Sequence, residues 1–204
     1  MGKARPRGRG RTTPRFRANI RPMRQLLLLR HAKSSWDDPG LSDHARPLNA
    51  RGRRAAAAMA GAMRDLGLQP DLVLVSSARR TLQTLEALTP FEDNALVEPM
   101  DALYLASASQ LMDAVRKTPE TVRSLLLIGH NPGLHELAVA LAGEAAAARG
   151  GKGTAAGRLA EAYPTGALAE FTVGVPWRAV APGSGRLVRF LSPRDLKDGT
   201  ESPR

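Results

Sequence analysis

Residues 26–34 read Leu-Leu-Leu-Leu-Arg-His-Ala-Lys-Ser, an unbroken apolar run that ends abruptly in basic side chains. The four leucines do not alternate with polar residues, which favours a strand covered on both faces, as in a parallel sheet flanked by helices. Ligands of open α/β sheets bind at the carboxyl ends of such strands. Arg30, His31 and Lys33 therefore stand where a ligand would bind, although basic residues also follow buried strands without any functional role.

Two later segments repeat the sequence of buried strand, polar turn and helix. Residues 71–75 are followed by Ser76 and Arg80, and residues 125–128 are followed by Gly129-His130-Asn131-Pro132-Gly133. Strands that alternate with helices predict right-handed crossovers and a largely parallel sheet, which brings all three polar turns to one edge. We therefore expect a three-layer α/β/α fold with a mostly parallel central sheet.

The remaining segments supply the other elements of this fold. We expect a helix from Asn49, its N-cap, to about residue 66, and others at 81–85, 109–117 and 134–141. A short strand is expected at 95–98. Strands at 167–173 and 187–191 are expected to pair antiparallel at one side of the sheet. Residues 143–157 are rich in Ala and Gly, which is typical of a mobile surface loop.

Composition bounds the class of protein. At 204 residues the chain suits one domain with a core of its own. Cysteine is absent, so disulfides, thiolate zinc sites and thiol catalysis are excluded. The apolar runs are far too short to cross a bilayer. We expect a soluble, cytoplasmic protein without a membrane span.

The basic charge is concentrated at the amino terminus. Residues 1–24 contain nine of the 30 Lys and Arg residues and no acid, so the remainder, with 21 basic and 19 acidic residues, has a net charge of +2. We expect 1–24 to be a disordered extension, 25–196 the folded domain and 197–204 a flexible tail. The extension could be inert or lie upstream of a start at Met23, bind RNA or a membrane surface, or act as a transit peptide. Nucleic-acid binding is weakly supported, because no aromatic residues are interleaved with the arginines.

The residues expected at the sheet edge suit an anion. Arg30, His31, Arg80 and His130 meet there, with Lys33, Ser76 and Asp101 as possible neighbours. Two histidines beside two arginines make a poor metal site, because a divalent cation would share it with fixed positive charge. Guanidinium groups bind phosphate oxygens bidentately. A neutral imidazole behind the phosphorus can then act as a nucleophile without a metal or other cofactor, and neighbouring cations would help to keep it neutral.

These blocks resemble the histidine phosphatase superfamily, which has the phosphoglycerate mutase-like fold. The resemblance rests on Arg30-His31-Ala32 after a strand, on Ser76 with Arg80 and Thr84, and on Gly129-His130. Further motifs resemble its SixA branch of small phosphohistidine phosphatases: Arg46-Pro47-Leu48 before Gly52, Gly129-His130-Asn131-Pro132, Pro164-Thr165 and Phe190-Leu191-Ser192-Pro193. Together they span about residues 25–196.

The resemblance implies a role for each site residue. His31 would be the nucleophile, and Arg30, Arg80 and His130 would form the phosphate pocket. Asp101 resembles the general acid of the larger relatives, or a substrate contact, and could equally be an ordinary loop aspartate. Two further basic residues are open: Lys33 could line the rim of the pocket, and Arg46 could bind the substrate phosphate or hold its loop in place.

Smaller points complete the assignment. Ala32 replaces the glycine of the usual Arg-His-Gly pattern, which is tolerated if its φ is negative. Arg79, His44 and His135 are expected to have ordinary structural or surface roles. The residues and the resemblance together imply a metal-independent phosphatase that removes phosphate from phosphohistidine on a protein partner through a covalent phosphohistidine intermediate on His31. The alternatives are a phosphatase of small phosphate esters and a non-enzymatic anion-binding module with a basic tail.

Overall fold

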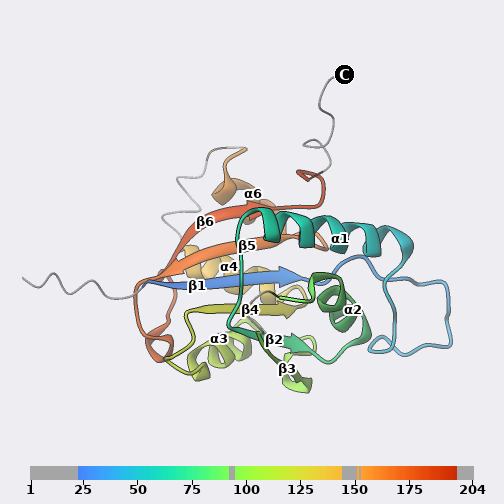
Figure 1. Cartoon of the computed structure of the whole chain (residues 1–204), viewed down its shortest axis with the longest axis horizontal. Coiled ribbons are helices and arrows are strands. Elements are labelled where there is room, and N and C mark those ends of the chain that lie inside the picture. The colour runs from blue at the N-terminus through green and yellow to red at the C-terminus, as the bar shows by residue number, and fades with distance from the viewer. Residues whose placement is uncertain (1–22, 92–94, 144–150, 152, 197–204) are drawn as a thin grey trace, which may run out of the picture.

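A computed structural model describes residues 23–91, 95–143, 151 and 153–196, and it shows one six-stranded sheet between two layers of helices (Figure 1). The strands are β1 (Arg24–Arg30), β2 (Leu72–Ser76), β3 (Leu96–Met100), β4 (Ser124–Gly129), β5 (Leu168–Val173) and β6 (Gly185–Leu191). Their order across the sheet is β3-β2-β4-β1-β5-β6. The pairs β1–β4, β2–β4 and β2–β3 are parallel, whereas β5 is antiparallel to both β1 and β6. The predicted three-layer fold with a mostly parallel sheet is confirmed.

The leucine run lies at the centre of the molecule. Strand β1 is flanked by β4 on one side and β5 on the other, and its four leucines are fully buried. Successive side chains of a strand point to opposite faces of the sheet. Leu26 and Leu28 therefore face one helical layer, and Leu27 and Leu29 face the other. An alternating sequence would have left one face polar, so the run specifies a strand covered on both sides.

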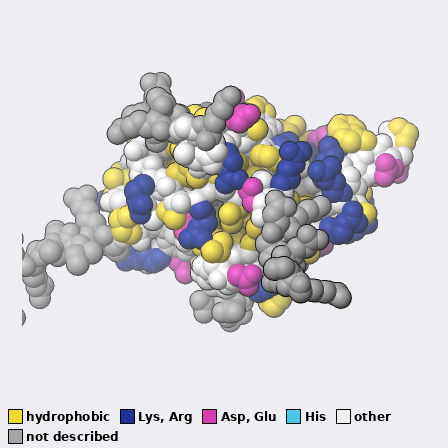
Figure 2. All heavy atoms as spheres, turned by 90° about the horizontal axis from the view of Figure 1, so that it is seen from above, with side chains coloured by type: hydrophobic (Ala, Val, Ile, Leu, Met, Phe, Trp, Pro, Cys, Tyr) yellow, Lys and Arg dark blue, Asp and Glu magenta, His cyan; other side chains and the backbone are white. Residues whose placement is uncertain are grey.

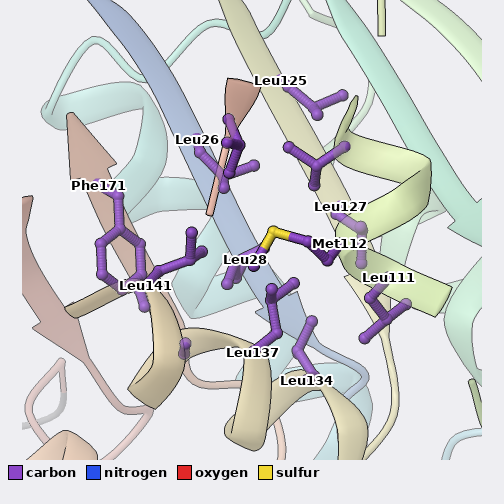
Figure 3. Close-up of a cluster of buried hydrophobic side chains, with 14 of the residues drawn as sticks. Leu26, Leu28, Leu111, Met112, Leu125, Leu127, Leu134, Leu137, Leu141 and Phe171 are labelled. Atoms are coloured by element: carbon purple, nitrogen blue, oxygen red, sulfur yellow. The ribbon is translucent and has the colours of Figure 1, made fainter. Parts of the chain in front are cut away.

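The helices divide between the two faces. Helices α1 (Ala50–Asp65) and α2 (Arg79–Leu88) pack on the face of Leu27 and Leu29. Helices α3 (Ala108–Lys117), α4 (Gly133–Ala142) and α6 (Ala155–Glu161) cover the opposite face. Figure 3 shows that second core, in which leucines of β1 and β4 point toward apolar side chains of α3 and α4. Two short 3-10 helices, η1 (Asp101–Leu103) and η2 (Trp177–Ala179), lie in connections.

The helix ends follow the predicted caps. The Asn49 side chain accepts from the Gly52 backbone N–H at the start of α1. Ser107 caps α3 through a capping box with Gln110. The exposed face of α1 carries Arg51, Arg53, Arg54 and Arg64, and the view from above shows Lys and Arg side chains gathered on this side (Figure 2). The arginines of α1 therefore form a solvated face of the helix.

The bounds of some elements differ from those expected, and some expectations concern residues outside the described part of the chain. Strand β1 begins at Arg24, one residue before the expected domain start, and Arg24 forms an ion pair with Glu120 at 2.6 Å. Helix α6 starts inside the segment 143–157 that we expected to be a loop. The expectations for residues 1–22 and 197–204 lie outside the described residues. No helix in the described part of the chain is long and apolar enough to span a bilayer.

The topology brings the three polar turns together. Because β1, β2 and β4 are parallel, their carboxyl ends lie at one edge of the sheet. Arg30 is in register with Gly129, and Val75 is in register with Ile128. His31 and His130, which follow β1 and β4, and Ser76, the last residue of β2, are therefore neighbours in space although they are far apart in sequence. This edge holds the candidate site.

Candidate active site

A cavity of about 410 Å³ opens at the carboxyl edge of the sheet. Six residues singled out in the sequence line it: Arg30, His31, Lys33, Arg46, Arg80 and His130. The other lining residues are Ser34, Trp36, Asp43, Leu105, Asn131 and Thr165. A larger cavity of about 650 Å³ lies beside α4, but its lining contains no lysine or arginine among the described residues. Charge, and not volume, makes the smaller cavity the candidate anion site.

His31 has its ring fixed by two contacts. Its Nδ1 lies 2.7 Å from the backbone carbonyl of Ala32, which can only accept, so Nδ1 carries the proton. Nε2 is then the unprotonated nitrogen, and the Nε of Arg80 donates to it at 3.4 Å. This tautomer leaves the Nε2 lone pair available as a nucleophile.

The ionisation of His31 suits that chemistry. Burial is the largest cause that lowers its pKa, to about 4, and the charges of Arg80, Arg30 and Arg46 lower it further. The neutral ring is therefore the stable form of the free protein near neutral pH. The sequence predicted that neighbouring cations would help to keep the His31 ring neutral. Desolvation by burial, however, is the largest cause of the lowered pKa, and burial depends on the tertiary structure.

His130 stands opposite His31. The ring centroids are 5.0 Å apart and the rings are tilted by 55°. Arg80 approaches the Nδ1 of His130 through Nη2 at 3.4 Å, and since a guanidinium can only donate, the His130 proton is on Nε2, which donates to Ser76 Oγ at 2.7 Å. Burial, followed by the charge of His31, lowers the His130 pKa to about 3. Ser76, at the end of β2, thus acts by orienting His130.

Arg30 supplies a second guanidinium at the end of β1. Its Nη1 donates to the Tyr163 carbonyl at 2.7 Å, and burial, followed by the Arg80 charge, lowers its pKa. Its Nε is buried without a hydrogen-bond partner, as is the Oδ1 of Asn131. Buried donors are ordinarily paired, so this Nε is available to an anion in the cavity, although Arg24 and Arg158, which do not line the cavity, also have a buried, unpaired Nε.

The two remaining basic residues of the cavity, Arg46 and Lys33, differ in their contacts and their exposure. Arg46 donates to Ser35 O at 2.9 Å, to Asp43 Oδ1 at 2.7 Å and to Ser34 Oγ at 2.7 Å. Its guanidinium also lies over the ring of Trp36, 3.0 Å from the centroid. Two roles were open for Arg46, binding the substrate phosphate or holding its loop in place, and these contacts match the second. Lys33 is exposed and lines the cavity.

The backbone around His31 is held by helices α1 and α2. The Ala32 N–H donates to Thr84 Oγ1 at 3.0 Å, and Thr84 Oγ1 donates to the Arg80 carbonyl at 2.7 Å. Among the described residues Leu105 is the one non-glycine residue with a positive φ, 49°, so Ala32 is tolerated where the usual pattern has glycine. Gly52 of α1 lies so close to the Lys33 carbonyl that a Cβ there would stand 2.0 Å from it.

The carboxylate in the cavity is Asp43, which the sequence analysis missed. Asp101 is exposed on η1 and is not among the residues that line the cavity. Asp43 Oδ2 accepts from Arg80 Nη2 at 2.9 Å and from the Tyr104 hydroxyl at 2.7 Å. Asp43 lies in the loop after β1, which has no periodic pattern, so no signal in the sequence identified it.

The ionisation of Asp43 follows from these contacts. The hydrogen bond from Tyr104 is the largest cause that holds the Asp43 pKa well below its ordinary value, and Arg46 and Arg80 add to it. Burial, together with the Asp43 carboxylate, raises the pKa of Tyr104. Asp43 is thus an ionised ion-pair partner and a poor proton donor.

Comparisons with known proteins agree with this geometry. The model of the histidine phosphatase superfamily (branch 1) matches residues 26–103. An uncharacterised protein of Mycobacterium tuberculosis is 36% identical over 166 residues, which cover 81% of this chain and all of that protein.

Solved structures are also similar to this chain, over more than 80% of its length. A protein of Nakamurella multipartitia, provisionally named phosphohistidine phosphatase SixA, has a TM-score of 0.72 at 28% identity and covers 84% of this chain and 96% of its own. Its provisionally named counterpart from Agrobacterium tumefaciens has a TM-score of 0.68 at 30% identity, covering 83% and 98%. A mycobacterial glucosyl-3-phosphoglycerate phosphatase, at 16% identity and a TM-score of 0.53, covers 82% and 98% and shares the fold.

Proposed function

The chain belongs to the histidine phosphatase superfamily, as a SixA-type member, and from this premise we propose that it removes phosphate from phosphohistidine on a protein. The proposed reaction uses His31 as a nucleophile and requires no metal. The observation that carries the proposal is the state of Asp43, the carboxylate that lines the cavity. Because it is ion-paired and ionised, it is unsuited to protonate a leaving group.

The proposed first step is in-line attack. The Nε2 lone pair of His31 forms a bond to phosphorus while the bond from phosphorus to the substrate nitrogen breaks, and that nitrogen keeps the electron pair. A phosphoimidazole protonated on its other ring nitrogen leaves as a neutral imidazole, so no enzyme acid is needed. An alkyl phosphate would leave as an alkoxide, for which a proton donor is valuable. The cavity therefore favours phosphohistidine over an ester.

The proposed second step is hydrolysis of the phosphoenzyme. Water attacks the phosphoryl group on His31, the bond from Nε2 to phosphorus breaks, and inorganic phosphate is released with the neutral imidazole restored. Arg30 and Arg80 would stabilise the charge on the phosphoryl oxygens in both steps. The unpaired Nε of Arg30 and the long contacts of Arg80 to the two histidines provide donors for those oxygens.

A protein substrate is supported by the rim of the cavity. Trp36 and Leu105 both line it, and these residues are 72% and 53% exposed. Leu105 also adopts a backbone conformation that bulky residues seldom occupy. Exposed large apolar side chains beside a charged site are typical of a surface that meets another protein.

The test is phosphate release, with excess EDTA, from a phosphohistidine-bearing protein and from a panel of small phosphate esters. The wild type is compared with His31→Ala and with His135→Ala, a matched control whose ring contacts the Leu159 carbonyl away from this cavity. We expect preferential release from phosphohistidine, unchanged in His135→Ala and reduced at least about 1000-fold in His31→Ala, as for other lost nucleophiles.

Each outcome of this test decides part of the proposal. Preference for an ester would contradict the proposed substrate while leaving the superfamily in place. Turnover retained in His31→Ala would contradict the proposed nucleophile. Acid-labile, alkali-stable phosphate trapped on the wild type and absent from His31→Ala would support the covalent step.

A further inference from the structure

We infer that Asp43 is a positioning residue, which holds the Arg80 guanidinium so that its Nε–Nη2 edge faces the reacting phosphoryl group. This inference rests on the proposed reaction at His31 and deepens it. It assigns a role to a loop residue that the sequence analysis did not single out.

Asp43 accepts hydrogen bonds from both terminal nitrogens of the Arg80 guanidinium. Arg80 Nη1 donates to the Asp43 backbone carbonyl at 2.5 Å, and Nη2 donates to Asp43 Oδ2 at 2.9 Å. One residue thus engages both terminal nitrogens, through its main chain and its side chain. A guanidinium is planar with donors in a fixed fork, so fixing its end also fixes the direction of its side edge.

The side edge of Arg80 points into the site. Its Nε is directed at His31 Nε2 and its Nη2 at His130 Nδ1, each at 3.4 Å. These contacts are long, whereas the contacts to Asp43 are short and the one to its carboxylate is charge-assisted. A phosphoryl oxygen can therefore replace the long contacts while Asp43 keeps the short ones. Arg80 would then meet the substrate without reorienting.

Asp43 is in turn held by other elements. Arg46, on the same loop, donates to Oδ1, and Tyr104, which follows η1, donates to Oδ2. The carboxylate connects the loop after β1, helix α2 and the connection after η1. Arg80 is only 3% exposed, so its charge is buried and would be costly if left without this partner. Asp43 therefore holds the guanidinium of Arg80, which acts in the proposed reaction, in a fixed orientation.

The test begins with Asp43→Asn. Asparagine has one acceptor oxygen in place of two and places an NH₂ group toward the donors of Arg46 or Arg80. We expect kcat to fall about 10- to 100-fold, because misplacement of a catalytic group by about 1 Å is worth roughly that much. We expect KM to change less than about threefold. Asp113→Asn is the matched control, since it removes an exposed carboxylate from an ion pair with Arg116 on α3.

A double-mutant cycle then asks whether Asp43 acts through Arg80. Arg80→Lys keeps a positive charge but has no planar fork for Asp43 to orient. In this background we expect Asp43→Asn to reduce kcat by less than about threefold, a non-additive result. Equal fold losses in both backgrounds, or an Asp43→Asn variant that matches Asp113→Asn in turnover, would overturn the inference. Thermal unfolding of each variant shows whether lost turnover comes from lost folding.

The cycle is run on whichever substrate the wild type hydrolyses best. If that substrate is an ester, the proposed phosphohistidine specificity fails, yet the cycle still tests Asp43 because Arg80 meets the same phosphoryl group. If phosphohistidine is preferred but the losses are additive, the positioning role fails and the proposed function stands.

Discussion

The pKa of a single residue, His31, connects the fold to the chemistry. The ring is 7% exposed and cannot be hydrated as it is in the unfolded chain. Burial and three arginines therefore penalise its protonated form, which lowers the folded pKa to about 4 from the ordinary 6.5. The same desolvation that keeps the His31 ring neutral thus makes folding dependent on pH.

We predict that His31 makes the protein less stable in acid. Its folded pKa is depressed, so between pH 6.5 and 4 the unfolded chain binds more protons and the free energy of unfolding falls as pH decreases. The shift corresponds to about 3 kcal/mol for this one group. Denaturant unfolding between pH 7 and pH 4 should show a smaller loss in His31→Asn, whose amide can still donate to the Ala32 carbonyl. The same pH dependence in both proteins would contradict a depressed His31 pKa.

At the scale of elements, α1 and α2 hold the turn that carries His31. Helix α2 supplies Thr84 to the Ala32 N–H, and α1 places Gly52 against the Lys33 carbonyl. The Asn49 N–H also donates to that carbonyl at 3.0 Å. The close approach of α1 therefore needs a residue without a Cβ at position 52, for a packing reason that is separate from helix propensity.

Two glycines of α1 are predicted to respond oppositely to alanine. Gly52→Ala would place a Cβ 2.0 Å from the Lys33 carbonyl oxygen, and we expect a loss of about 1–3 kcal/mol from overpacking, with lower turnover because the turn shifts. Gly61→Ala meets its nearest atom at 3.9 Å, and we expect it to stabilise the helix by about 0.5–1 kcal/mol. Chemical denaturation of both variants checks this pair. Equal effects would show that α1 does not pack tightly against the turn that carries His31.

At the scale of the whole molecule, the cavity joins a cationic floor to an apolar rim. The floor comes from the ends of β1 and β4 and from α2, and the rim comes from two connections, one after β1 and one after η1. Trp36 is additionally held in place by Arg46 beneath its ring. In the proposed reaction, a phosphoryl group on a small molecule would contact the floor alone, whereas one on a protein would bring a protein surface against the rim.

We predict that the rim affects protein substrates selectively. Trp36→Ala and Leu105→Ser should each raise KM for a phosphohistidine-bearing protein about 5- to 30-fold, which corresponds to roughly 1–2 kcal/mol of contact energy. KM for phosphoramidate, which lacks a protein surface, should change less than twofold. Leu96→Ser on the edge strand β3 is the matched control, because Leu96 is 61% exposed and does not line the cavity. Equal changes for both substrates would contradict a docking role.

The sequence alone determined the overall fold of this protein and the edge of the sheet at which the site lies. The run Leu26–Leu29 specified a strand buried on both faces, and the repeated order of strand, polar turn and helix specified the parallel sheet. It also brought Arg30, His31, Arg80 and His130 to one edge, because parallel strands present their carboxyl ends on the same side. These features are local and periodic, so they can be read from neighbouring residues.

The tertiary structure decided what depends on contacts between distant segments. The loop after β1 has no periodicity, so the sequence could not show that Asp43, and not Asp101, enters the cavity. The engagement of Arg46 by its own loop and the dominance of burial in the pKa of His31 likewise follow from packing. Solvent exclusion and hydrogen-bond geometry belong to the folded chain as a whole, because each depends on groups that many different elements contribute.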